Sequence, residues 1–422
     1  MFYYPYLGRD ILSGFDQYKY SCKDTSPLSN YVMHPFWNQV VKICPLWIAP
    51  NLLTFVGFLC CIAHNGLTWI YDYNYEASIH HSEDPIPSWV WISVSLLLFL
   101  SHTLDGIDGK QARRTGTSSP LGELFDHGCD SWSTVFITGT FYSVFGRNSD
   151  GYSISVFRMY CIVWTIFFSF HSSHWEKYNT GVMYLPWSYD IAMVGGTVLY
   201  MITGIFGYET WKVLLPSGQS PGVLVEGVLY FFCYGFALSV ALRNIYVSYR
   251  DGTGKMRPFF EAIVPLISFF LACLFCMIWV FASKNDILDQ SVRIFFLMSG
   301  TVYANMSCRL IVTQMSNTKA QMFNLLLIPL GLASLLCSTM PTSLGTEQAI
   351  LYLLTLLVTL VHVHYGTCVV MQMCEHFKID CFKIGGDGKS TAGGESRLLY
   401  TQVPQIIDEA DLDDSDDDEI MS

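Results

Sequence analysis

Charged side chains are scarce in this chain. Asp, Glu, Lys and Arg together make up 14% of its 422 residues, whereas 51% are hydrophobic and 15% are aromatic. This balance is typical of integral membrane proteins. Because the lysines and arginines form no basic cluster, the composition also argues against nucleic-acid binding.

A signal peptide and a disulfide pattern are also missing. The first thirty residues contain no continuous apolar stretch, so we expect no cleavable signal peptide. The fourteen cysteines are scattered, and most of them lie within apolar runs. This distribution predicts buried, reduced thiols and argues against a disulfide framework.

The net charge of −12 comes mainly from the C-terminal end. Nine acidic residues fall between Asp408 and Glu419, after a polar stretch rich in Gly and Ser. We predict that residues 376–422 form a disordered cytoplasmic tail. A solvated tail that aids solubility is the simpler interpretation, and docking of a partner is the alternative.

Apolar stretches of about 20 residues, the length that crosses a bilayer core, recur along the chain. We predict an all-α integral membrane protein whose transmembrane domain covers residues 49–375 and contains ten transmembrane helices. The predicted spans are 49–70, 88–107, 121–146, 153–173, 186–207, 223–243, 259–282, 292–314, 322–341 and 347–372. Residues 34–47, within the N-terminal segment 1–48, are mixed in polarity and predict an amphipathic helix lying in the membrane interface before the first span.

The basic residues predict the orientation, because Lys and Arg accumulate in short loops on the cytoplasmic side. With both termini cytoplasmic, the opposite loops contain only Arg147, Lys212, Lys284 and Arg293. Most other basic residues then fall on the cytoplasmic side, including those between Lys110 and Arg114. We expect Arg309, near the end of the eighth span, to extend its side chain toward the cytoplasmic interface.

Four aspartates lie close together at the ends of two predicted spans. Asp105 and Asp108 are three residues apart and Asp126 and Asp130 are four apart, so each pair shares one face of a helix. Each carboxylate at membrane depth costs roughly 2.5–3.5 kcal/mol if it is left uncompensated. The clustering therefore predicts a polar pocket in which two divalent cations, Mg²⁺ or Mn²⁺, offset the four negative charges. In this topology the pocket faces the cytoplasm.

The aspartates belong to a longer pattern of fixed spacing, DxxDGxxARx8GxxxDxxxD. The fixed positions are Asp105, Asp108, Gly109, Ala112, Arg113, Gly122, Asp126 and Asp130. This pattern resembles the signature of the CDP-alcohol phosphotransferases. The segments DGKQARRT, SPLGELFDHG and SHWEKYNTG are similar to the choline and ethanolamine phosphotransferases, and above all to the ethanolaminephosphotransferase branch that includes selenoprotein I. The similarity covers nearly all of residues 10–375.

The resemblance implies an enzyme that transfers phosphoethanolamine from CDP-ethanolamine to diacylglycerol, giving phosphatidylethanolamine and CMP. Use of CDP-choline, or of both donors, is the alternative within the family. A cation-binding transporter is a more distant alternative, which the single copy of the motif does not favour. The resemblance further implies an endoplasmic reticulum or Golgi membrane and a homodimer. Animal members of this branch carry selenocysteine in the C-terminal tail, whereas this chain does not.

Several residues of the motif are candidates for contact with the nucleotide diphosphate. The planar guanidinium of Arg113 suits phosphate oxygens. The small residues Gly106, Gly109, Ala112 and Gly122 allow a ligand to approach the backbone closely, or else they permit tight helix contacts. Asn51, at the start of the first span, matches a family position near the nucleotide, and capping of the helix is its alternative role.

A hydroxyl acceptor needs a base, and His127 and Asp130 are the candidates. His127 lies beside Asp126 and four residues after Glu123, so a hydrogen bond between the imidazole and the Glu123 carboxylate would orient the ring. Asp130 is the weaker candidate, because a carboxylate bound to metal is a poorer base. A histidine that only stabilises the helix bundle is the alternative for His127.

Overall fold

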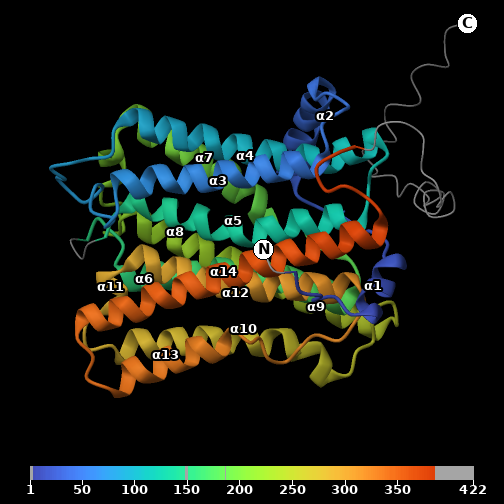
Figure 1. Cartoon of the computed structure of the whole chain (residues 1–422). Helices are drawn as coiled ribbons and strands as arrows, with labels where there is room; N and C mark the ends of the chain where they lie inside the picture. The colour runs from blue at the N-terminus through green and yellow to red at the C-terminus, as the bar shows by residue number, and fades with distance from the viewer. Residues whose placement is uncertain (1–2, 148–150, 186, 385–422) are drawn as a thin grey trace, which may run out of the picture.

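The computed structural model describes residues 3–147, 151–185 and 187–384, and the acidic tail lies outside this range. The described chain is a bundle of long helices that run roughly along one common axis (Figure 1). The prediction of an all-α membrane protein is confirmed. All fourteen cysteines are free, and six of them are buried while the other eight are partly exposed.

Each predicted span corresponds to a helix. The helices are α3 (Pro50–Tyr71), α4 (Ser88–Thr115), α5 (Pro120–Phe145), α6 (Val156–Thr180), α7 (Trp187–Phe206), α8 (Pro221–Tyr230) continued by η3 (Phe231–Ala237) and α9 (Leu238–Arg250), α10 (Phe259–Ala282), α12 (Val292–Met315), α13 (Leu327–Thr339) and α14 (Leu344–Phe377). Seven of them are long and apolar enough to cross a membrane. α5 and α6 are long but more polar, and α13 has only 13 residues. The count of ten spans therefore stays a prediction.

Short elements surround one end of the bundle. They are α1 (Arg9–Asp16), β1 (Cys22–Asp24), η1 (Ser29–Met33), α2 (His34–Ile43) and β2 (Met183–Leu185). Two further short elements, η2 (Tyr208–Trp211) and α11 (Ile287–Gln290), lie elsewhere. β1 pairs in parallel with β2, and Lys23 lies opposite Tyr184. This pairing ties the N-terminal segment to the connection between α6 and α7. Figure 1 shows α2 at a steep angle to the bundle axis, as expected for an interfacial helix.

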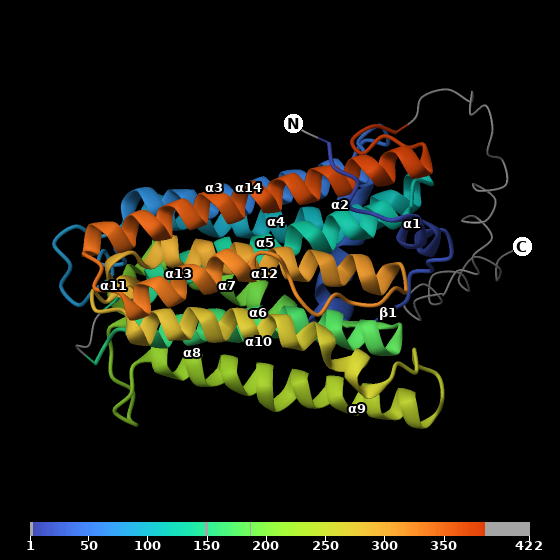
Figure 2. The same ribbon diagram turned by 60° about the horizontal axis from the view of Figure 1, so that its bottom comes forward.

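The helices pack around two central elements, α5 and α12. α5 contacts α3 and α12, while α12 also contacts α6, α10 and α14; Figure 2 shows α12 in the interior between α14 and α10. Most α12 side chains are buried, including polar ones such as Asn305 and Ser307. Helices α4 and α6 extend further than predicted and end at Gly116 and Gly181, whose positive φ angles of 65° and 83° close each helix.

Candidate active site

The two aspartate pairs come from α4 and α5, which a short turn joins. Arg113 and Gly109 lie on the last turns of α4, and α5 begins directly after Ser119. The Ser119 hydroxyl accepts a hydrogen bond from the Gly122 backbone nitrogen at 3.3 Å, which caps α5. The end of one helix and the start of the next therefore bring the two pairs to the same end of the bundle.

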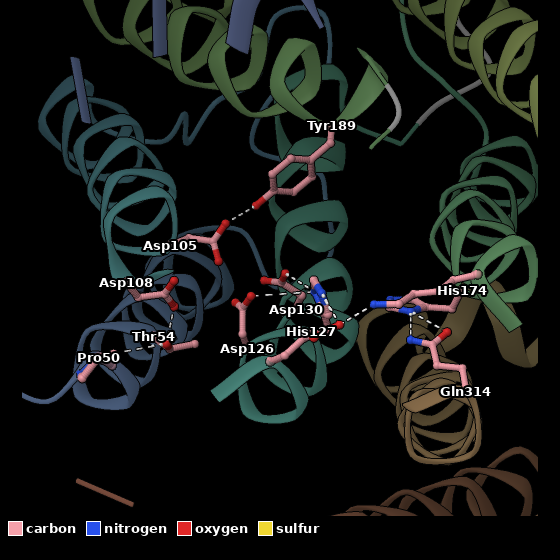
Figure 3. Close-up of polar contacts among 12 residues, drawn as sticks. Pro50, Thr54, Asp105, Asp108, Asp126, His127, Asp130, His174, Tyr189 and Gln314 are labelled. Carbon is pink, nitrogen blue, oxygen red and sulfur yellow. Dashed lines mark hydrogen bonds and ion pairs between the residues drawn. The ribbon is translucent and has the colours of Figure 1, made fainter. Parts of the chain in front are cut away.

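The structure brings all four aspartates into one cluster (Figure 3). Asp105, Asp108 and Asp126 offer one oxygen each, and these three atoms lie within 4.8 Å of one another. Asp126, His127 and Asp130 form a second group by the same measure. Asp126 belongs to both groups, so it lies at the centre of the cluster.

The donor set fits divalent cations. Carboxylate oxygens are the ligands that Mg²⁺ and Mn²⁺ prefer. One carboxylate oxygen of Asp126, Oδ1, is buried without a hydrogen-bond partner among the described residues. Such an atom is costly unless it has a ligand. The arrangement therefore suits the metal sites that the sequence predicted.

Two residues outside the motif hold the first aspartate pair. Thr54 of α3 donates a hydrogen bond to Asp108, and Tyr189 of α7 donates one to Asp105 Oδ2 at 2.8 Å (Figure 3). Sequence reasoning missed both residues. Thr54 lies three residues after Asn51, which is one helical turn, so this spacing was the available signal. No such signal marked Tyr189, because nothing in the sequence distinguishes it from the other tyrosines among the twenty-five in the chain.

His127 lies among three carboxylates without forming a hydrogen bond to any of them. Its Nε2 atom is 3.8 Å from Glu123 Oε1, and its Nδ1 atom is 3.8 Å from Asp126 Oδ2 and 4.0 Å from Asp130 Oδ2. The ring lies edge-on to His174 of α6, with centroids 5.3 Å apart. The expected hydrogen bond between His127 and the Glu123 carboxylate is therefore not formed, although the two side chains are neighbours.

Glu123 instead joins a buried network with Lys177 and Tyr18. Lys177 of α6 donates to Glu123 and, at 2.8 Å, to the Tyr18 hydroxyl. Tyr18 donates to Glu123 at 2.7 Å. Burial, and next the Glu123 carboxylate, raise the pKa of Tyr18, which keeps its hydroxyl protonated and able to donate. The sequence had assigned Lys177 only to the cytoplasmic charge pattern, because α6 was expected to end before it.

The small residues of the motif differ in their surroundings. A Cβ added to Gly106 would lie 2.1 Å from the Trp37 indole of α2, so this glycine permits close packing of α2 on α4. A Cβ at Gly109 or Gly122 would meet nothing closer than 3.7 Å. Ala112 is half-buried and Arg113 is exposed, and no carboxylate of a described residue lies within 4.0 Å of the Arg113 guanidinium.

Gly106→Ala is expected to destabilise the protein, because the buried indole of Trp37 has no room to move away. Overpacking of this kind costs about 1–3 kcal/mol. The measurement is the midpoint of thermal unfolding in detergent, compared with Gly109→Ala, whose new methyl meets only the flexible Arg113 side chain at 3.8 Å. Equal midpoints for the two variants would show that α2 does not pack as described.

Asn51 does not cap its helix. Its Nδ2 atom donates to the Cys381 carbonyl at 3.0 Å, and α3 has no side-chain cap. Its Oδ1 atom lies beside Gly122, 3.7 Å from where a Cβ would be. The alternative role in capping is therefore wrong, and Asn51 extends its side chain from the first turn of α3 toward the first turn of α5.

Membrane helices with an acidic centre at one end define a membrane-embedded protein with a candidate metal site. The chain matches the model of the CDP-alcohol phosphatidyltransferase family over residues 47–215. It is 44% identical over 396 residues to ethanolaminephosphotransferase 1 of Mus musculus and of Homo sapiens, covering 94% of this chain and 99% of each relative. Choline/ethanolaminephosphotransferase 1 of Arabidopsis thaliana is 30% identical over 404 residues, or 90% of this chain and 98% of the relative.

The chain therefore belongs to the CDP-alcohol phosphatidyltransferase family. The resemblance inferred from the spacing of the aspartates and glycines is confirmed. The matched region contains α3, α4 and α5, and with them the whole aspartate cluster.

Proposed function

We propose that the chain is an ethanolaminephosphotransferase that moves phosphoethanolamine from CDP-ethanolamine to diacylglycerol, forming phosphatidylethanolamine and CMP. The main support for this proposal is an aspartate cluster in a chain that aligns over nearly its whole length with ethanolaminephosphotransferase 1 of mouse and human. The cluster consists of Asp105, Asp108, Asp126 and Asp130. A soluble donor and an apolar acceptor need a site that both water and lipid can reach, and an acidic centre near one end of a helix bundle meets that need.

The four aspartates would hold two divalent cations, Mg²⁺ or Mn²⁺, with Asp126 shared between them. When bound, such ions neutralise the diphosphate and stabilise the oxygens that enter and leave the phosphorus. Arg113, exposed and without a carboxylate partner, is placed to engage the diphosphate from the last turn of α4. Gly109 and Gly122 leave open space for the nucleotide, whereas Gly106 serves packing, and Asn51 and Ala112 line the same end of the bundle.

The acceptor hydroxyl oxygen bonds to the phosphorus of phosphoethanolamine while the bond from that phosphorus to the CMP oxygen breaks. His127 takes the hydroxyl proton through Nδ1, because this atom faces the aspartate cluster, 3.8 Å from Asp126 Oδ2 and 4.0 Å from Asp130 Oδ2, and makes no hydrogen bond to either carboxylate. Asp130 remains the second candidate base. Glu123 acts on His127 through charge at 3.8 Å, while Lys177 and Tyr18 fix its position.

His127→Ala is expected to lower CMP release by about 100-fold or more, the usual contribution of a general base. The measurement is CMP release from purified protein in detergent, with His80→Ala, in a loop outside the cluster, as the control. His127→Asn separates the two roles of the ring: if hydrogen bonding in the bundle is all that matters, asparagine restores activity and the base assignment fails.

The choice of headgroup is tested by competition. Purified protein is supplied with diacylglycerol, Mg²⁺ or Mn²⁺ and an equimolar mixture of CDP-ethanolamine and CDP-choline, and the two lipid products are quantified. We expect phosphatidylethanolamine to predominate. A predominance of phosphatidylcholine would favour the cholinephosphotransferase alternative. Equal amounts of the two lipids would favour a dual enzyme, as the name of the Arabidopsis relative describes. No CMP from either donor would overturn the enzyme assignment and return the cation transporter to consideration.

The setting of the enzyme is part of the proposal. The distribution of Lys and Arg supports cytoplasmic termini and a cytoplasmic site. Residence in the endoplasmic reticulum or Golgi membrane and assembly as a homodimer follow from the family resemblance. Protease accessibility of a tag placed after residue 422 in sealed microsomes tests the orientation, because a cytoplasmic tail is cleaved without detergent.

A further inference from the structure

A cavity that none of the four aspartates lines lies beside α12. It is bounded by α12, the start of α10, α14, the N-terminal segment and the loop before α13. Its volume is about 70 Å³, whereas a single water molecule needs roughly 10–15 Å³ of such space. The cavity therefore has room for a group of several heavy atoms, such as a phosphate.

Arg309 of α12 lines this cavity and is held in place by neutral groups. Its Nε atom donates to Asn305 Oδ1 at 3.2 Å. Its guanidinium lies over the rings of Tyr365, 4.4 Å from the centroid, and Tyr6, at 5.9 Å. Among the described residues, no carboxylate lies within 4.0 Å of the Arg309 side chain. The sequence predicted that this arginine reaches for the interface, whereas it is fixed in a pocket with its terminal nitrogens available.

The lining of the cavity is positive. Polar side chains that line it, among them Ser268, Thr313 and Gln321, are neutral, and no aspartate or glutamate is present in the lining. An arginine without a carboxylate partner in such a lining favours an anion.

The surroundings of the cavity are apolar on the outside. Phe323 lines it and is 46% exposed, while the neighbouring Met322 and Leu325 are 52% and 70% exposed. On a membrane protein, such a surface contacts acyl chains. A charged cavity beside a lipid-facing surface fits the phosphate of a lipid better than a free inorganic ion.

We propose that the cavity around Arg309 binds the phosphate of a phospholipid with net negative charge, at a site separate from the aspartate cluster. The preference for net negative charge follows from the described lining, which contains the Arg309 guanidinium and no aspartate or glutamate to balance it. The bidentate fork of Arg309 engages the phosphate oxygens, and the acyl chains lie along the surface that carries Phe323 and Leu325.

The test is native mass spectrometry of the full-length protein titrated with phosphatidylserine. The wild type is compared with Arg309→Gln, with Arg309→Lys in case the first variant folds poorly, and with Arg250→Gln as a matched control. Arg250 is an exposed arginine whose guanidinium pairs with Asp251 outside the cavity. We expect about tenfold weaker binding for Arg309→Gln, an intermediate loss for Arg309→Lys and no change for the control.

Three competition arms identify the ligand. Inorganic phosphate at millimolar concentration is expected to leave phosphatidylserine binding unchanged, and diacylglycerol, which has no phosphate, is expected not to compete. Phosphatidylethanolamine is expected to compete poorly because it carries no net negative charge. Unchanged phosphatidylserine binding by a folded Arg309→Gln or Arg309→Lys variant would overturn the site. Full competition by inorganic phosphate would overturn the lipid as its occupant. Strong competition by phosphatidylethanolamine would overturn the preference for net negative charge.

Discussion

Asp126→Ala is expected to reduce CMP release by at least about 100-fold while the helix bundle stays folded. Asp126 is the one residue that belongs to both candidate ligand groups, so its removal weakens both cation sites at once. The buried Oδ1 atom makes no hydrogen bond to the described protein, so little structural support is lost with it. Removing a negative charge from a cluster of four also relieves repulsion among the remaining carboxylates.

The control for this prediction is Asp251→Ala, which removes an exposed carboxylate from the loop after α9. CMP release and the midpoint of thermal unfolding are measured for both variants over a range of Mn²⁺ concentrations. We expect an unchanged or higher midpoint for Asp126→Ala without metal and a smaller stabilisation by added Mn²⁺ than in the wild type. Activity of more than a few per cent, with normal stabilisation by Mn²⁺, would contradict the assignment of Asp126 as a shared ligand.

Lys177→Met is expected to cause the largest loss of stability among changes near the cluster. The Lys177 side chain is 2% exposed and that of Glu123 is 8% exposed, so water does not screen the pair. Removing one partner of a buried ion pair leaves the other charge uncompensated, which costs about 3–5 kcal/mol. Because Glu123 lies beside His127, we also expect a fall in CMP release.

A double variant separates loss of the charge pair from loss of packing. Glu123→Gln combined with Lys177→Met replaces both charges with neutral groups of similar size, and we expect it to recover much of the thermal stability that Lys177→Met loses. Tyr18→Phe, which removes only the hydroxyl that joins Glu123 and Lys177, is expected to lower thermal stability less than Lys177→Met does. If the double variant is as unstable as the sum of the two single variants, the residues do not act as a buried pair.

The sequence was sufficient for the acidic centre because its signal is local. Residues three or four apart on a helix share a face whatever the rest of the fold does, so Asp105 with Asp108 and Asp126 with Asp130 were predictable as pairs. The ranges of the apolar helices were predictable for a similar reason, since about 20 apolar residues have few alternatives to crossing a bilayer. Helix ends were less predictable: α6 continues through polar residues to Thr180, where no apolar run marks its course.

Most partners of the site residues could not be predicted, because they depend on which helices are neighbours. Tyr189 and Lys177 reach the site from α7 and α6, and their separation along the chain gives no indication of contact. The role of Glu123 shows the same limit. Its spacing from His127 favoured a local hydrogen bond, but a buried lysine from another helix offers a stronger, charge-assisted partner.

The contacts of the N-terminal segment have a consequence for biosynthesis. The Leu7 backbone donates to Gln372 Oε1 at 3.0 Å and accepts from Gln372 Nε2 at 3.2 Å, across 365 residues of sequence. Leu7 therefore reaches its place only after α14 has entered the membrane. Since Tyr18 on the same segment donates to Glu123, a chain without α14 is expected to leave this network without its anchor, and catalytic competence then depends on insertion of α14.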